Sequence, residues 1–210
     1  MATTSNYGWT TPDDSSLVKD GASAIRALGT AIDTSMNTAL GTKKSGLVLL
    51  NTTSFSGVSS QSINDVFSTT YDKYKILIDA QCSATPQISM RLRVSGADNS
   101  TSNYYFTGFY SFSSDTTIGN DNLYKADPDS LFAIGIGGTN QTAINVDLVS
   151  PFLSAYTAFV AQSGSISGTN EAYSLNTNGG FTGTTSFTGF TLIPSTGTMS
   201  GSVSVYGYNK

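Results

Sequence analysis

Few side chains in this sequence could take part in catalysis. The 210 residues contain no histidine and a single cysteine, Cys82. Histidine is the usual general base and the most common metal ligand, and Ser-His-Asp and Cys-His arrangements both require it. Glu171 is the only glutamate, so a glycosidase would have to use pairs of aspartates. The sequence therefore predicts a protein that is not an enzyme and that uses no cofactor.

One segment, GNDNLYKADPDS at 119–130, gathers side-chain oxygens. Carboxylate and amide oxygens suit Ca²⁺, but their spacing here does not match an EF-hand loop. We therefore expect a solvated surface loop over 119–129 rather than a metal site. The oxygen-bearing residues of the segment are Asn120, Asp121, Asn122, Asp127 and Asp129.

Aromatic side chains are concentrated just before that segment, in YYFTGFYSF at 104–112. Their number favours packing in a core or in a subunit interface. The functional alternative is a platform on which sugar rings stack, with nearby amide and carboxylate oxygens accepting hydrogen bonds from sugar hydroxyls. For that alternative, the candidate contacts with a host receptor or glycan are Tyr104, Tyr105, Tyr110, Asp121 and Asn122.

The only tryptophan, Trp9, lies in a polar opening segment, SNYGWTTPDDSSLVKDG at 5–21. Residues 1–16 show neither helical nor strand periodicity, so we expect an extended arm there. Burying an indole is one of the largest apolar gains available to a side chain, so this position indicates docking into another surface. The alternative is that Trp9 folds back on its own helix or β domain. The candidate docking residues are Tyr7, Trp9, Pro12, Asp13 and Asp14.

A helical pattern covers 17–41. The run TPDD at 11–14 supplies a capping hydroxyl, a proline and acids for the positive end of the helix, and Gly41 ends the pattern. A helix of this length, about 30 Å, is marginal by itself in water. Self-association is favoured over packing on the chain's own β domain, because the arm and a linker at 42–46 isolate the helix. The residues assigned to oligomerisation are Val18, Ile25, Leu28, Ile32 and Met36.

From residue 47 to 210 the apolar period changes to two, and Gly, Asn, Ser and Pro clusters separate the runs. This predicts a mainly β fold, an antiparallel jelly-roll-like β-sandwich preceded by one N-terminal α-helix and an extended arm. The alternation predicts inward-facing residues in five of the runs. They are Tyr74, Ile76, Ile78, Ala80 and Cys82; Ile88, Met90, Leu92 and Val94; Ile144, Val146 and Leu148; Tyr156, Ala158 and Val160; and Val203 and Val205.

The formal net charge is −4 and there is no basic run, so binding to a nucleic-acid backbone is disfavoured. No apolar run of about 18 residues is present, so we expect no membrane insertion. No signal-peptide pattern opens the chain, which predicts synthesis in the cytoplasm. A single cysteine excludes an internal disulfide, and we expect Cys82 to be a buried, unreactive thiol.

Several segments carry a resemblance. YGWTTPDDSSLVKDGASAIRALGTAIDTS (7–35) resembles the N-terminal segment of structural proteins of tailed bacteriophages. SINDVFSTTYDKYKILID (62–79), INVDLVSPFLSAYTAF (144–159) and FTGFTLIPSTGTMSGSVSVYGY (187–208) are similar to strand motifs in the globular domains of the same proteins. These are virion proteins of the minor tail, tail-fibre or head-fibre type.

The resemblance implies a function and a set of partners. It implies a virion protein, assembled in the host cytoplasm and anchored to other tail or capsid proteins by its N-terminus. Fibre-type proteins are commonly three-fold, which implies a homotrimer that presents a β-sandwich to a glycan or protein of the host surface. The alternative is a capsid decoration protein or head fibre that stabilises the particle.

Overall fold

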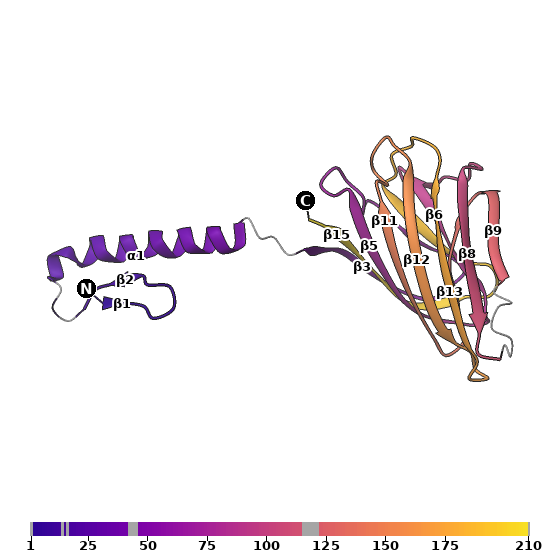
Figure 1. Cartoon of the computed structure of the whole chain (residues 1–210), viewed down its shortest axis with the longest axis horizontal. Coiled ribbons are helices and arrows are strands. Elements are labelled where there is room, and N and C mark those ends of the chain that lie inside the picture. The colour runs from indigo at the N-terminus through magenta and orange to yellow at the C-terminus, as the bar shows by residue number, and fades with distance from the viewer. Residues whose placement is uncertain (1, 14, 16, 42–45, 115–121, 210) are drawn as a thin grey trace. The chain divides into compact units, whose positions relative to one another are not determined.

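The computed structural model describes residues 2–13, 15, 17–41, 46–114 and 122–209 (Figure 1). The chain divides into two compact units, Met1–Gly46 and Leu47–Lys210. The described part contains no helix long and apolar enough to cross a bilayer.

The first unit is a short hairpin beside a helix. Strands β1 (Ala2–Thr3) and β2 (Thr10–Thr11) pair antiparallel, so the segment predicted as an extended arm has extended backbone but folds on itself. One turn of 3-10 helix, η1 (Val18–Asp20), leads into α1 (Gly21–Met36), and a π-helical turn, η2 (Asn37–Gly41), ends it. The helical region therefore matches the predicted 17–41 within a residue.

The second unit is built from thirteen described strands, all paired antiparallel. Their bounds are β3 (Leu47–Val58), β4 (Gln61–Ile63), β5 (Lys73–Cys82), β6 (Gln87–Val94), β7 (Ala97–Asp98), β8 (Tyr104–Phe112), β9 (Asn122–Asp129), β10 (Phe132–Ile136), β11 (Gln141–Val149), β12 (Thr157–Ile166), β13 (Ala172–Phe181), β14 (Gly189–Pro194) and β15 (Met199–Tyr208).

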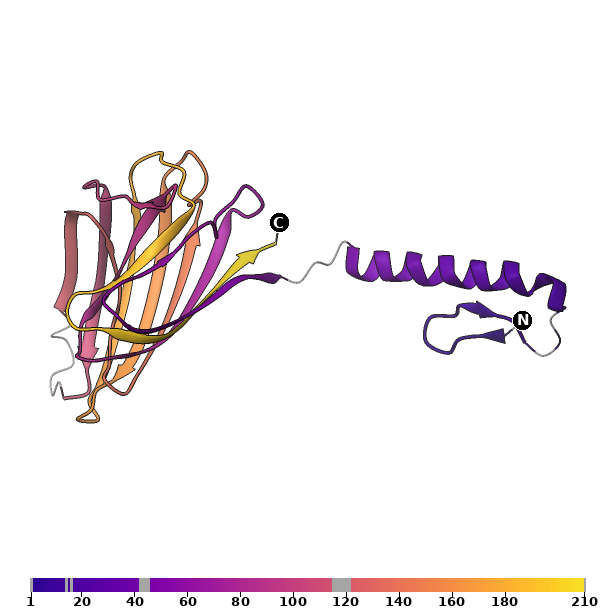
Figure 2. The same ribbon diagram turned by 180° about the vertical axis from the view of Figure 1, so that it is seen from behind.

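The strands form two facing sheets, so the predicted β-sandwich is confirmed (Figure 2). The larger sheet has eight strands in the order β3-β15-β5-β11-β12-β13-β8-β9. The smaller sheet has the order β10-β6-β14-β4, with β7 paired to β6. Side chains from the facing sides form one core, because β10 packs against β12 and β13 of the larger sheet.

Four of the five predicted inward sets lie in this core. The residues predicted to face inward on β5, β6, β11 and β15 are buried. The exception is Val94 at the end of β6, which is only half-buried. Cys82 is buried, as expected. Ser89, on the opposite face of β6, is buried as well.

The prediction for β12 is wrong. Tyr156, Ala158 and Val160 are exposed, and the opposite face of the strand is buried. The physical reason is Phe159, whose ring packs against Phe132 with centroids 4.3 Å apart and so fixes which face turns inward. The rest of the buried face is small and mostly hydroxylated, which made it look solvent-exposed: Thr157, Ala161, Ser163 and Ser165.

Candidate functional site

The predicted docking segment is held in a defined turn. Between β1 and β2, the Thr4 amide donates to the carbonyl of Trp9 and the Gly8 amide donates to the carbonyl of Thr4, both at 2.9 Å. The Trp9 amide donates to the Thr4 hydroxyl at 3.0 Å. Gly8 has φ +65°, a left-handed conformation that glycine adopts without strain. The turn therefore fixes the direction in which the two aromatic side chains leave the backbone.

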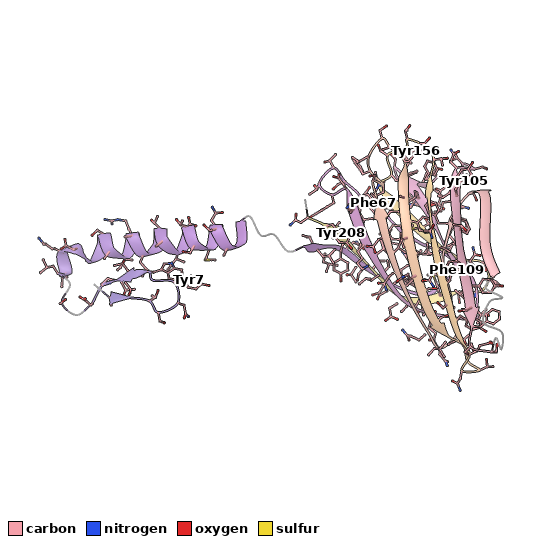
Figure 3. All side chains as sticks on the ribbon, viewed as in Figure 1. Tyr7, Phe67, Tyr105, Phe109, Tyr156 and Tyr208 are labelled. Atoms are coloured by element: carbon pink, nitrogen blue, oxygen red, sulfur yellow. The ribbon has the colours of Figure 1, made fainter. Side chains whose placement is uncertain are left out.

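The two aromatic rings of the turn stack on each other. The centroids of Tyr7 and Trp9 are 5.0 Å apart and their planes differ by 14°. The indole Nε1 of Trp9 donates to the hydroxyl of Ser35 in α1 at 2.9 Å. Trp9 thus folds back on its own helix, the alternative left open by the sequence, while Tyr7 stays 70% exposed (Figure 3). A groove of about 230 Å³ beside this pair is lined by Tyr7, Trp9, Ser35, Met36 and Ala39.

The capping role predicted for 11–14 is wrong, because the residue at the N-cap of the helical region is Leu17, with no side-chain capping hydrogen bond. The carboxylate of Asp13 accepts hydrogen bonds from the amide of Ser15 at 3.2 Å and from its hydroxyl at 2.8 Å. This local turn engages the carboxylate, and the helical backbone begins only at Val18, beyond the reach of Asp13 as a first-turn acid. Pro12 is exposed, and Asp14 lies outside the described residues.

The predicted oligomerisation stripe is only partly covered within the unit. Half-buried positions recur every three or four residues, which places them on one face, and β2 contacts α1. Leu28 and Ile32 are among these half-buried residues. Val18, Ile25 and Met36 are 97%, 65% and 54% exposed and form the free part of the stripe. The half-buried positions of α1 are Gly21, Ala24, Leu28, Ala31, Ile32 and Ser35.

None of the described residues of the first unit is buried. A helix this short gains most of its stability in proteins from packing an apolar face, and here the strongly apolar side chains remain in contact with water. The apolar side chains of this unit are therefore only partly covered within the unit itself.

The predicted receptor contacts in 104–112 have different environments. Tyr104 is fully buried; its hydroxyl accepts from the Leu92 amide at 3.2 Å and donates to the Asn99 carbonyl at 2.8 Å. Its assignment as a surface contact is therefore wrong, because side chains alternate along β8 and Tyr104 takes the inner face. Tyr105 is exposed and Tyr110 is half-buried. Asp121 and the side chain of Asn122 lie outside the described residues.

Several charged side chains of the sandwich bond to neighbouring side chains. Lys75 and Asp147, on neighbouring strands, form an ion pair of 3.2 Å, and the Tyr208 hydroxyl donates to Asp147 at 2.8 Å. This hydrogen bond raises the pKa of Tyr208. The hydroxyls of Ser114 and Tyr173 donate to Glu171 and lower the pKa of its carboxyl. Within the described part of the chain, no three potential metal ligands cluster together.

Three comparisons with known proteins were made. No family model, curated protein or solved structure matches this chain.

Sequence reasoning missed one surface. Tyr156 and Val160 were assigned to the core, yet they are among the exposed large apolar residues at this part of the larger sheet, with Tyr105, Phe109 and Ile166. The signal that could have found it is the complete lack of charge in the three adjacent strands β8, β12 and β13.

Proposed function

We propose that this protein is a bacteriophage virion structural protein, a small trimeric fibre or spike. Its N-terminal unit anchors it to other proteins of the particle, and its β-sandwich faces the host surface. The observation that carries the proposal is the N-terminal unit itself, in which no described residue is buried and the apolar side chains are exposed.

The unit offers an aromatic surface and an aliphatic surface, which meet at the groove lined by Tyr7, Trp9 and Met36. Tyr7 and Trp9 form a stacked aromatic pair on the hairpin, and large aromatic residues are the side chains most often found as anchors in interfaces. The exposed helix residues Val18, Ile25 and Met36 supply a second, aliphatic surface suited to helix–helix contact with further copies of the chain. The hairpin is therefore assigned to docking and the helix to trimerisation.

The composition supports attachment rather than catalysis. The chain has no histidine, and Lys75 and Asp147 form an ion pair across neighbouring strands, as Arg93 and Asp98 do. The resemblance of 7–35 to the N-terminal segments of tailed-phage structural proteins points to the same role. The second candidate, a capsid decoration protein or head fibre, shares the anchoring unit and differs in the position of the protein on the particle.

Electron microscopy of particles labelled with a gold-conjugated antibody against the sandwich tests the proposal. Label at the tail tip supports a tail fibre or spike, and label on the capsid faces supports the decoration protein or head fibre. Purified particles that contain no copy of the protein by mass spectrometry would overturn both.

A further inference from the structure

A groove of about 550 Å³ lies on the larger sheet of the sandwich. Its size falls in the range of small-molecule sites. It is formed by the edge of β8, the last residues of β13 and the residues that lead into β12, and Figure 3 labels Tyr105 and Tyr156 at that end of the sheet. The outward side chains that line it are Tyr105, Thr107, Tyr156, Ala158, Asn178 and Thr182.

The strand register explains the hollow. Tyr105 on β8 is paired with Gly180 on β13, and Gly180 is paired with Ala158 on β12. One tyrosine therefore lies beside two positions with almost no side chain, and the floor between them is largely bare backbone. A Cβ on Gly180 would lie 2.4 Å from the carbonyl oxygen of Thr157, so the packing of the strands keeps this floor free of side chains.

The walls of the groove are amphipathic. Tyr156 is 66% exposed and Tyr105 is 38% exposed, so both rings are accessible. Asn178 is the next outward residue of β13 after Gly180, and its register partner on β8 is Thr107. An amide and a hydroxyl therefore lie at one end of an aromatic hollow.

The residues that line the groove carry no charge, although Thr107 is paired across the sheet with Lys125 of β9. None of the residues of β8, β12 and β13 is acidic or basic. A phosphate, sulfate or carboxylate ligand would require cationic partners, which these strands lack. The groove is therefore complementary to an electrically neutral ligand.

The pattern of side chains selects the class of ligand. The outward column of β13 is polar, with Asn178, Asn176 and Ser174 following one another. Covering this column with an apolar face of another protein would bury amides without partners, which costs free energy. A sugar offers C–H groups on its ring face for the electron-rich face of tyrosine, and hydroxyls at its edge for amides.

We infer that this groove binds a neutral saccharide, with the rings of Tyr105 and Tyr156 contacting its ring faces and Asn178 bonding its hydroxyls. The inference deepens the host-attachment role and rests on the proposed function for its biological setting. It also accounts for the exposed apolar face of β12. Residues of a binding surface are selected for the ligand, so they often break the apolar-inside pattern that predicts a fold.

The test is binding of the full-length chain to immobilised oligosaccharides. The probes are neutral gluco-, galacto- and manno-oligosaccharides, with sialylated and sulfated oligosaccharides for comparison. We expect binding to neutral probes only, with little dependence on salt because no ion pair is involved.

Three variants locate the site. Tyr105→Ala and Tyr156→Ala should each weaken binding about tenfold or more, because each removes one stacking ring. Ala158→Arg should abolish binding by filling the floor. Phe109→Ala is the matched control, since Phe109 is an exposed aromatic on the same face of β8 that does not line the groove, and it should bind as the unchanged chain does.

Four results would overturn the inference. Two concern the probes: no binding to any neutral probe, or binding to acidic probes only. Two concern the variants: a loss of binding in Phe109→Ala equal to that in the tyrosine variants, or a fall in oligomeric mass in both tyrosine variants. The last result would mean that a second copy of the chain covers the groove. Saccharide binding by a protein absent from particles would overturn only the proposed function, and a virion protein that binds no neutral saccharide would overturn only this inference.

Discussion

The indole of Trp9 and the hydroxyl of Ser35 join the N-terminal hairpin to the helix through one hydrogen bond of 2.9 Å. These residues are 26 positions apart in the chain. The bond links a side chain of the hairpin to a side chain of the helix. Because Trp9 is the only tryptophan, tryptophan fluorescence reports on the surroundings of this one ring.

Ser35→Ala should therefore loosen the hairpin without affecting the sandwich. Losing one such hydrogen bond costs on the order of 1 kcal/mol. We expect a red shift of tryptophan emission and stronger quenching by acrylamide, with an unchanged Tm of the sandwich. Thr34→Ala is the control, because the Thr34 hydroxyl bonds to the Thr30 carbonyl within the helix. Equal emission spectra of Ser35→Ala and the unchanged chain would contradict the contact.

The exposed helix residues should hold the trimer together. Replacing both Ile25 and Met36 by glutamate places like charges where apolar side chains would meet, and each buried apolar side chain of this size contributes about 1.5–3 kcal/mol. Light scattering should give a trimer for the unchanged chain and a monomer for the double variant. A control pair on exposed polar positions, Thr30→Glu with Thr34→Glu, should remain trimeric. An unchanged chain that is monomeric at micromolar concentration would count against trimerisation by the chain alone.

Neighbouring residues of β12 provide a test of which face is buried. Phe159→Ala should lower the free energy of unfolding by about 3–5 kcal/mol, because it empties a space between the two sheets. Val160→Ala should change it by less than about 0.5 kcal/mol, since Val160 is exposed. Urea unfolding followed by circular dichroism gives both values. A larger loss for Val160→Ala than for Phe159→Ala would reverse the assignment.

Two buried tyrosines should make the sandwich sensitive to alkali. Burial raises the pKa of Tyr104 and of Tyr74 above the ordinary value of 10.0. Below about pH 10 these hydroxyls are neutral in both the folded and the unfolded chain, and their full contribution to the free energy of unfolding is present. As the pH rises toward the higher folded-state pKa, the unfolded chain ionises first and this contribution is lost. The ultraviolet absorbance of tyrosinate should therefore show some tyrosines ionising only as the protein unfolds.

Tyr104→Phe separates this effect from general alkaline unfolding. The variant should be less stable at neutral pH by about 1–3 kcal/mol, because the Leu92 amide and the Asn99 carbonyl lose their partner. Its stability should fall less steeply above pH 10 than that of the unchanged chain. Equal slopes would show that Tyr104 does not contribute to the alkaline loss.

The fold could largely be predicted from the sequence because most of the strands have one clearly apolar face. β5 alternates Tyr74, Ile76 and Ile78 with Lys75, Leu77 and Asp79, and the two charged residues mark the outer face. β12 could not be predicted, because its inner face is built from hydroxyl and small residues around Phe159 and its outer face includes Tyr156 and Val160. Alternation identifies a strand, but which of its two faces turns inward depends on the residues that the facing sheet supplies.

The candidate sites were predicted less completely for similar reasons. Periodicity identified the helix, but the half-burial of Leu28 depends on a hairpin whose four paired residues carry no recognisable pattern. The stack of Tyr7 on Trp9 depends on the turn at Gly8. The groove depends on strands that are distant in the sequence, since Tyr105 and Gly180 become neighbours only through the pairing of β8 with β13.

The central claim is that the hairpin anchors this protein to a virion. The most direct measurement is the number of copies per purified particle, by quantitative mass spectrometry, after complementation with the double variant Tyr7→Ala, Trp9→Ala. Truncating one anchor aromatic costs roughly 2–4 kcal/mol at an interface, so occupancy should fall by at least about tenfold while the Tm of the sandwich stays unchanged. Phe109→Ala should leave occupancy unchanged. Full occupancy by the double variant would contradict the account.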